Sequence, residues 1–360
     1  MINPQDLRNL LEEDMKFQVD EKFIIDCFKD IVAVPSPVGY FTQLNPVLER
    51  YAAMFGQTVT YDNRSTAYIT LDGEDNSRTV LLGAHADTLG LMVRKIENDG
   101  RIRVRALGGI NYCNVEGESV TVYTRDGRPY TGMMICQSHS VHAFLDARTL
   151  PRNEDTMLIL LDEKVSSKED VLALGIRNGD FVHIDPYCEF TEKGFLKSRF
   201  IDDKAAIACT FAMLKYLTEN NLKPKYRTIL AFPYQEEIGI GGRYVPEEVS
   251  EYVAVDIGII GPDYEGNEYS VSICAKDKNG PYNFDLTSHL VNLAEKAECD
   301  YVVDVFLNYS TDANAALRAG NNIRQAAFGM ACYCSHGRER THISGLTNTT
   351  NLMLAYVLGI

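Results

Sequence analysis

Histidine and carboxylate side chains stand at the ends of several apolar stretches in this sequence. His85 and Asp87 end one stretch, Glu236 and Glu237 end a second, and Asp256 ends a third. Buried carboxylates are costly unless they are paired or bound to a metal, so several of them together imply a cation. The pattern therefore indicates a metal site rather than ordinary packing.

Two further pairs extend the same pattern. Asp202 and Asp203 stand just before a helical stretch, and His336 and His342 follow the last apolar run. In open α/β sheets, sites form beyond the carboxyl ends of the strands. We therefore expect these side chains to converge on one edge of a sheet.

The ligand types narrow the choice of metal. Imidazole with carboxylates, and no thiolate among them, suits zinc, cobalt or manganese. Two histidines with three or more carboxylates exceed the three protein ligands of a single catalytic zinc. We expect two divalent ions that share a bridging carboxylate, roughly 3.5–4 Å apart, because such a pair can lower the pKa of a bridging water.

We expect neighbouring residues in these motifs to have different chemical roles. His85 and Asp87 lie on one side of an extended strand, so Asp87 could accept a hydrogen bond from His85 and fix its tautomer. Glu236 and Glu237 would point to opposite faces of a regular strand. One would bind metal, and the other would accept a proton from the metal-bound water.

The elements that position these residues are strands buried on both faces. Four apolar stretches predict them: TVLLGAHAD (79–87), RTILAFPYQEE (227–237), YVAVDIG (252–258) and IRQAAFGMACYCSH (323–336). Helical patterns at 202–221, 288–298 and 312–320 lie between several of them, and Gly320 is a candidate C-cap. Strands that alternate with helices indicate an α/β sheet.

The middle of the chain has a different pattern. From about residue 91 to 188, short alternating strands are joined by NDG, RDG and NGD turns, and Asn or Asp next to Gly is the strongest short-range hairpin signal. Several close hairpins suggest a small β-barrel or sandwich. We predict an α/β domain formed by residues 1–90 and 189–360, with a β domain inserted at 91–188.

Composition argues against several classes of partner. Lys and Arg total 35 against 50 Asp and Glu, and the formal charge of −15 disfavours nucleic acid or an anionic membrane as partner. No apolar run approaches the ~18–20 residues that a membrane span needs. The first 17 residues predict an amphipathic helix rather than a signal peptide, and the nine scattered cysteines suit reduced thiols, so we expect a cytoplasmic protein.

The motifs GAHAD, IDDK, PYQEEIGIGG, AVDIG, STDA and RTHIS occur in an order that resembles the glutamyl/tetrahedral (deblocking) aminopeptidase family of dinuclear metallopeptidases. Members of this family are sometimes named endoglucanase or cellulase. The resemblance covers nearly the whole chain. It implies a mixed-sheet co-catalytic metallopeptidase fold with an inserted PDZ-like β-barrel that mediates dimerisation.

The resemblance also implies a set of metal ligands. His85 and Asp256 resemble ligands of one ion, and Asp202 resembles the bridging carboxylate. Glu237 and His342, the latter in RTHIS, resemble ligands of the second ion. Two divalent ions per subunit follow, with zinc first and cobalt or manganese as alternatives.

Catalytic roles and assembly follow from the same resemblance. Glu236 resembles the general base, and Asp87 resembles the carboxylate that supports the first histidine. The implied activity is hydrolysis of the N-terminal residue of a peptide through a bridging metal-bound water. The implied assembly is a homo-oligomer, built from dimers and extending in some members to a tetrahedral dodecamer. Thr88 and Lys204 depart from the family pattern, and they leave the substrate preference open.

Several residues keep alternative interpretations. His336 competes with His342 as the last ligand. Asp203 suits a charge at a helix N-terminus, and Asp312 either caps a helix or belongs near the active site. His139 suits an interface or surface position better than a metal site.

Three other interpretations of the chemistry compete with the leading one. Cys332 and Cys334 with His336 have metal-like spacing, but a structural zinc site usually has a second pair, so we expect thiols packed in a strand. A glycoside hydrolase would need two carboxyls about 5–9.5 Å apart and no histidines, and the chain has no Trp for a sugar platform. A non-catalytic metal-binding homologue is the third possibility.

Overall fold

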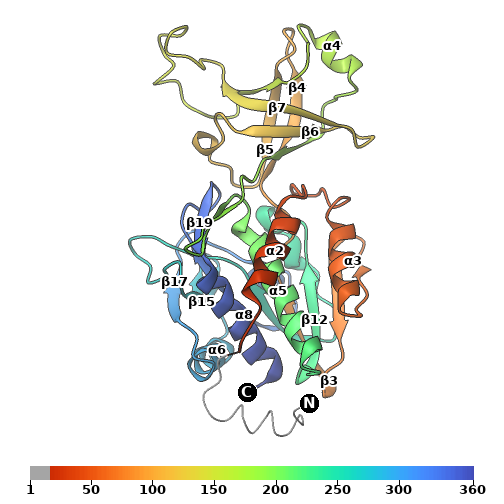
Figure 1. Cartoon of the computed structure of the whole chain (residues 1–360), viewed down its shortest axis with the longest axis vertical. Coiled ribbons are helices and arrows are strands. Elements are labelled where there is room, and N and C mark those ends of the chain that lie inside the picture. The colour runs from red at the N-terminus through yellow and green to blue at the C-terminus, as the bar shows by residue number, and fades with distance from the viewer. Residues whose placement is uncertain (1–16) are drawn as a thin grey trace.

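Two parts of different architecture are stacked along the long axis of the molecule (Figure 1). The computed structural model describes residues 17–360, and the helix expected over the first 17 residues lies outside this range except for Phe17. An α/β part carries the C-terminus, and a β-barrel forms the other end. Within residues 17–360, no helix has the length and apolar character to cross a membrane.

The α/β part is built on a ten-stranded mixed sheet, in the order β1-β2-β12-β3-β13-β18-β15-β16, with β14 beside β18 and β17 beside β15. Its centre consists of four parallel strands: β12 (Tyr226–Phe232), β3 (Asp75–Gly83), β13 (Val249–Val255) and β18 (Arg324–Cys332). The flanking strands are β1 (Thr60–Tyr61), β2 (Ala67–Leu71), β14 (Gly258–Ile259), β15 (Val271–Asp277), β16 (Gly280–Pro281) and β17 (Tyr301–Val305).

The four central strands coincide with the four apolar stretches, but each strand ends before its polar residues begin. In the second stretch the strand stops at Phe232, since Pro233 has no N–H to continue the ladder. Glu236–Ile238 then form a short 3₁₀ turn instead of the end of a regular strand. The polar residues of all four stretches therefore lie on loops beyond the sheet.

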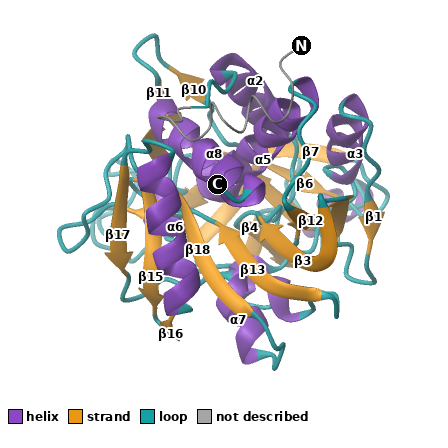
Figure 2. Cartoon of the chain, turned by 90° about the horizontal axis from the view of Figure 1, so that it is seen from below, coloured by secondary structure: helices purple, strands orange, loops and turns teal. Residues whose placement is uncertain are grey.

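Helices cover both faces of this sheet (Figure 2). On one face lie α2 (Glu21–Val32), α5 (Ile201–Glu219), α6 (Phe284–Lys296) and α8 (Ile343–Leu358), while α7 (Asp312–Arg318) lies on the other. A further helix, α3 (Asn45–Met54), packs beside β2. The three helices expected from periodicity are present as α5, α6 and α7, and Gly320 follows the last of them at a φ of +96°.

The barrel is closed by six strands in the order β4-β5-β8-β7-β6-β9. Their bounds are β4 (Gly90–Ile96), β5 (Ile102–Leu107), β6 (Ser119–Tyr123), β7 (Pro129–Cys136), β8 (Met157–Leu161) and β9 (Phe181–Ile184), with α4 (Lys168–Ala173) between the last two. The expected α/β fold with an inserted small β-barrel is thus confirmed. The exact limits of the two domains stay a prediction.

A third, small sheet joins distant parts of the chain. It contains β10 (Glu189–Phe190), β11 (Phe195–Ser198) and β19 (Glu339–His342). The strand β19 leads directly into α8, so its last residue is fixed at the start of a helix. That residue is His342, one of the predicted metal ligands.

Candidate metal centre and active site

The carboxyl ends of the four parallel strands meet at one edge of the sheet. In the register of the sheet, Gly83 of β3 lies beside Ala231 of β12 and Ala254 of β13, and Val255 lies beside Phe328 of β18. The loops that leave these strands therefore start side by side. This is the convergence that the sequence predicts for the ligand-type side chains.

Two groups of these side chains are close enough to hold an ion. Ligand atoms of His85, Asp202 and Glu237 all lie within 4.8 Å of one another, and so do those of His85, Asp203 and Asp256. The shortest contact joins His85 Nε2 and Asp202 Oδ1, which are 2.9 Å apart. Four of the five predicted metal ligands thus come together, and Asp203 joins them instead of serving only as a charge at the start of α5.

His336, rather than His342, is the second histidine of this cluster. Its Nε2 lies 3.4 Å from Glu237 Oε2 and 3.5 Å from Asp202 Oδ2. Its Nδ1 lies 3.0 Å from the carbonyl oxygen of Gly109, which leaves Nε2 facing the two carboxylates. The loop after β18 therefore places the His336 imidazole beside the carboxylates that the other loops contribute.

The structure places His342, the other predicted histidine ligand, outside this cluster. His342 is the N-cap of α8, and its Nδ1 accepts a hydrogen bond from the Ser344 N–H at 3.1 Å. Its Nε2 lies 2.8 Å from the Lys193 carbonyl oxygen, and its ring packs between Phe195 and Tyr269. Both ring nitrogens are therefore committed to structural contacts.

Asp87 supports the site differently from the expectation. Its carboxylate is 3.6 Å from His85 Nδ1, and the nearer acceptor is the Asp87 carbonyl oxygen at 3.0 Å. The fully buried carboxylate accepts hydrogen bonds from the N–H groups of Glu236 and Glu237, at 3.1 and 3.2 Å. Asp87 consequently fixes the turn that carries both glutamates, and its carbonyl orients His85.

Glu236 and Glu237 lie differently relative to the cluster, and they stand on a short turn instead of a regular strand. Glu237 belongs to one of the two ligand groups, and Glu236 belongs to neither. Glu236 Oε2 still lies 3.9 Å from His85 Nε2, so its carboxylate faces the cluster from the side. Glu236 therefore lies beside the candidate ligands without belonging to either group.

Sequence reasoning missed a carboxylate that holds two of these loops. Glu339 is buried, and its two oxygens accept hydrogen bonds from the N–H groups of Asp202 and His336, at 3.0 and 3.2 Å. It stands on β19 and has no motif of its own, so the sequence carried no signal for it. Glu339 acts as a positioning residue for two candidate ligands.

The inserted region also reaches the site. A Cβ added at Gly109 would lie 3.0 Å from His336 Nδ1, and one at Gly108 would lie 3.2 Å from Glu237 Cβ. Gly108 also has a φ of +84°, which glycine adopts without strain. The loop after β5 therefore packs closely against two candidate ligands because it has no side chains there.

The electrostatics of the cluster call for a cation. Burial raises the pKa of Glu237 to about 8 and that of Asp256 to about 7, with Asp202 nearby acting in the same direction. Burial also raises the pKa of Glu236 and of Asp203 well above their usual range. These carboxyls cannot all ionise beside one another without added positive charge.

The residues present fit divalent metal. The donors are imidazole nitrogen and carboxylate oxygen, and no cysteine of the described residues joins either ligand group. Asp203 Oδ1 is buried without a hydrogen-bond partner among the described residues, as expected for an oxygen that faces a cation. Cys332 is buried and Cys334 is exposed, which agrees with free thiols at the end of a strand.

A cavity of about 540 Å³ opens onto the cluster. Asp202, Glu236, Glu237, Asp256 and His336 form its floor. Its other walls are Ile238, Gly239, Ile257, Ile259, Lys278, Asn308, Tyr309, Ser310 and Ser335. The cavity is large enough for an amino-acid side chain and one end of a peptide.

The remaining candidates lie elsewhere or play supporting parts. Asp312 is buried in the first turn of α7, and its Oδ1 accepts a hydrogen bond from Gly242, while Thr311 is the N-cap. Asp312 thus fixes the loop that follows the glutamate turn.

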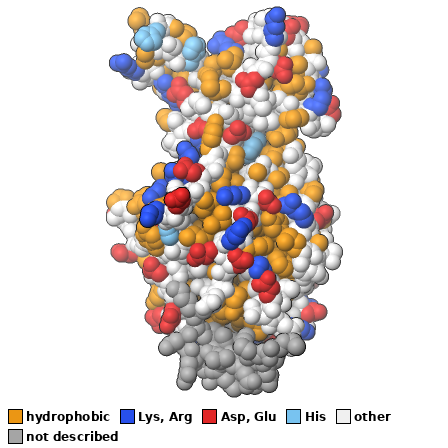
Figure 3. Space-filling view, viewed as in Figure 1, with side chains coloured by type: hydrophobic (Ala, Val, Ile, Leu, Met, Phe, Trp, Pro, Cys, Tyr) orange, Lys and Arg blue, Asp and Glu red, His pale blue; other side chains and the backbone are white. Residues whose placement is uncertain are grey.

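Lys204 is buried and donates to carbonyl groups at the end of α2, away from the cavity. His139 is exposed on the barrel beside Phe144, and Figure 3 shows histidines at the barrel's outer end.

Comparison with known families agrees with this arrangement. Residues 66–352 match the M42 glutamyl aminopeptidase family. The chain belongs to this family. Metal-dependent aminopeptidase activity is the function that M42 membership supports, and the fold expected from the motifs is the fold of the family.

Relatives of this M42 chain extend over most of its length. It is 40% identical to the YhfE protein of Bacillus subtilis (strain 168) over 334 residues, which are 92% of this chain and 96% of that one. It is 22% identical to the glutamyl aminopeptidase of Lactococcus lactis subsp. cremoris over 224 residues, 62% of each chain.

Solved structures share the fold. The TET1 peptidase of Pyrococcus horikoshii superposes with a TM-score of 0.83 at 23% identity, covering 94% of this chain and 100% of that one. A protein of Thermotoga maritima named endoglucanase superposes with a TM-score of 0.71 at 17% identity, covering 92% and 96%. At these identities the likeness concerns the fold alone.

Proposed function

We propose that this M42 protein is a dinuclear metalloaminopeptidase that removes the N-terminal residue of peptides. His85, Asp202 and Asp256 would hold one divalent ion, and Asp202, Glu237 and His336 would hold the other. Zinc is the first choice, with cobalt or manganese as alternatives. The observation that carries the proposal is the convergence of these side chains from separate loops at one edge of the sheet, beside a cavity that all of them except His85 line.

Each residue around the cluster has a distinct part in the reaction. When bound, the ions would lower the pKa of a water and stabilise the oxyanion that forms from the scissile carbonyl. Glu236 would take the proton of the attacking water at its carboxylate and pass it to the leaving amine. Asp87 would keep Glu236 and Glu237 in place through their N–H groups, and Glu339 would do the same for Asp202 and His336.

We also propose that the protein forms a homo-oligomer through its inserted barrel. The Pyrococcus horikoshii TET1 peptidase can assemble into a tetrahedron or a large octahedral shell. The barrel here exposes Val141, Phe144 and Leu145 on one loop, and exposed apolar groups of this kind favour association. A cytoplasmic location stays a prediction.

Removal of metal should distinguish the peptidase from the glycoside hydrolase that the Thermotoga maritima relative's name suggests. We expect a chelator to abolish cleavage of aminoacyl anilides, because the ions would supply the positive charge that stabilises the oxyanion. Zinc, cobalt or manganese should restore it. The measurement is the release of anilide before and after dialysis, with a soluble cellulose oligosaccharide as parallel substrate. Oligosaccharide cleavage that survives chelation would overturn the peptidase assignment.

Lys278 should favour an acidic residue at the N-terminus of the substrate. It is the one lysine or arginine among the described residues that line the cavity, and its ammonium group has no hydrogen bond or ion pair within the described part of the chain. We expect Lys278→Met to lower kcat/KM for a glutamyl anilide by about tenfold, the size of one hydrogen bond to a charged group.

The matched controls for this prediction are Lys278→Arg and a leucyl anilide. The arginine variant should keep most of the glutamyl activity, and the leucyl substrate should respond little to either change. An equal loss of activity on both substrates would show that Lys278 does not recognise the side chain of the substrate's N-terminal residue.

A further inference from the structure

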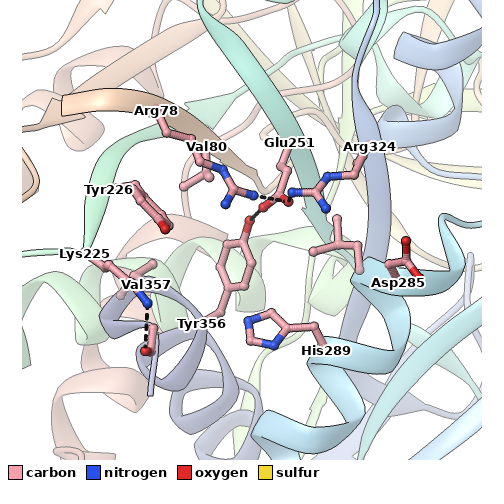
Figure 4. A pocket seen from close by; sticks show the side chains of 12 residues that line it. Arg78, Val80, Lys225, Tyr226, Glu251, Asp285, His289, Arg324, Tyr356 and Val357 are labelled. Carbon is pink, nitrogen blue, oxygen red and sulfur yellow. Dashed lines mark hydrogen bonds and ion pairs between the residues drawn. The ribbon is translucent and has the colours of Figure 1, made fainter. Parts of the chain in front are cut away.

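A second pocket opens at the opposite edge of the same sheet, at the amino ends of its central strands (Figure 4). Its volume is about 260 Å³, and none of its lining residues lines the cavity beside the metal cluster. Arg78 of β3 stands seven residues before His85. The strand ends at Gly83, and at about 3.3 Å per residue its portion from Arg78 to Gly83 alone separates the two sites by about 16 Å.

The pocket is organised around one buried carboxylate. Glu251 of β13 has a side chain only 4% exposed, and it accepts hydrogen bonds or ion pairs from Arg78, Arg324 and Tyr356. The distance from the Tyr356 hydroxyl is 2.7 Å. Two guanidinium groups thus share one carboxylate, which leaves a positive charge that Glu251 does not balance.

The two arginines keep donors for another partner. Each arginine pairs with Glu251 through its Nη2, and its other guanidinium nitrogens have no hydrogen bond to an acceptor among the described residues. The Arg78 and Arg324 side chains are 31% and 45% exposed. In Figure 4 both guanidinium groups border the space between the labelled side chains.

Further donors approach from other elements. Lys225 directly precedes β12, and its Nζ is 3.4 Å from the Gly359 carbonyl oxygen and has no acidic partner among the described residues. His289 of α6 borders the pocket, and burial lowers its pKa, with Lys225 acting in the same direction. Among the described residues, the exposed Asp285 is the only carboxylate besides Glu251 that lines the pocket.

The charge of the pocket is opposite to that of the chain. Three cationic side chains, Arg78, Lys225 and Arg324, face two carboxylates, whereas the whole chain has a formal charge of −15. Guanidinium groups present planar pairs of donors that match phosphate and carboxylate oxygens, and an ammonium group adds a third direction. If the ion pairs of Glu251 served only to stabilise the sheet, they would require neither the open pocket beside them nor Lys225.

We propose that this pocket binds a small oxyanion of the phosphate type, held by Arg78, Arg324 and Lys225. The ligand would be either inorganic phosphate or the phosphate group of a small phosphomonoester. Its charge would balance the second guanidinium group and the ammonium group at once. This site is independent of the metal centre and of the proposed peptidase activity.

Isothermal titration of the metal-loaded protein tests the proposal, in chloride buffer at constant ionic strength. Inorganic phosphate and glycerol phosphate are titrated into the parent chain and into Lys225→Gln. The variant should bind at least about tenfold more weakly, because one charge-assisted hydrogen bond is lost. Its turnover of aminoacyl anilides should not change, since Lys225 lies at the far edge of the sheet.

The exposed Lys223→Gln is the matched control, because Lys223 lies two residues away and outside the pocket. Phosphate that binds only at the metal centre would respond equally in both variants, and that result would overturn the proposal, as would absence of saturable binding. The double variant Glu251→Gln with Arg324→Gln removes a donor without leaving a bare carboxylate, and it should also bind more weakly. Tighter binding of glycerol phosphate than of inorganic phosphate would identify an ester as the ligand source.

Discussion

Replacing Glu236 with glutamine should lower kcat for aminoacyl anilides by about 10²- to 10⁴-fold, the range that a positioned general base contributes. Glutamine has nearly the same shape but cannot accept the proton. The metal content should stay the same, because Glu236 belongs to neither ligand group. The measurement is kcat together with metal per chain after dialysis.

The neighbouring residue provides the matched control. Glu237→Gln changes the same turn by the same chemistry, but it removes a candidate ligand within 4.8 Å of His85 and Asp202. We expect this variant to lose metal and activity together. If Glu236→Gln instead loses metal and Glu237→Gln retains it, the two roles are exchanged, although the turn held by Asp87 would still explain why adjacent glutamates differ.

The fold was predictable because its signals are local. Continuous apolar stretches mark the four central strands, and the NDG, RDG and NGD turns mark the hairpins of the barrel. What the stretches did not reveal is where each strand stops. Asp87 belongs to a loop beyond β3, so the expected side-by-side geometry of a regular strand does not apply. Its carboxylate instead reaches the glutamate turn, which is 149 residues further along the chain.

Residues that act through loops far apart in the sequence were the ones missed. Glu339 bridges the N–H groups of Asp202 and His336, a contact that no local pattern encodes. Lys278 stands on the turn between β15 and β16, and only the packing of that hairpin beside the cavity shows its importance. The candidate ligands at the strand ends could be predicted from the sequence, whereas the contacts that hold them in place depend on tertiary structure.

The two histidines after β18 offer the sharpest test of the site. His336→Ala should reduce metal affinity by more than about 100-fold, beyond what the loss of a supporting contact costs, and activity should fall with it. His342→Ala should keep its metal and its kcat. It should instead lower the free energy of unfolding by about 0.5–2 kcal/mol, because it removes the N-cap of α8.

Metal analysis and denaturant unfolding of the two variants separate the assignments cleanly. If His342→Ala lost metal while His336→Ala kept it, the last ligand would be the one that the RTHIS motif suggested, and the loop after β18 would have to rearrange on metal binding. Distance along the chain already favours His336, which stands four residues after Cys332 while His342 stands ten. A loop that leaves a strand end delivers its first suitable side chain to the edge of the sheet, and by His342 the chain has entered β19 and is starting α8.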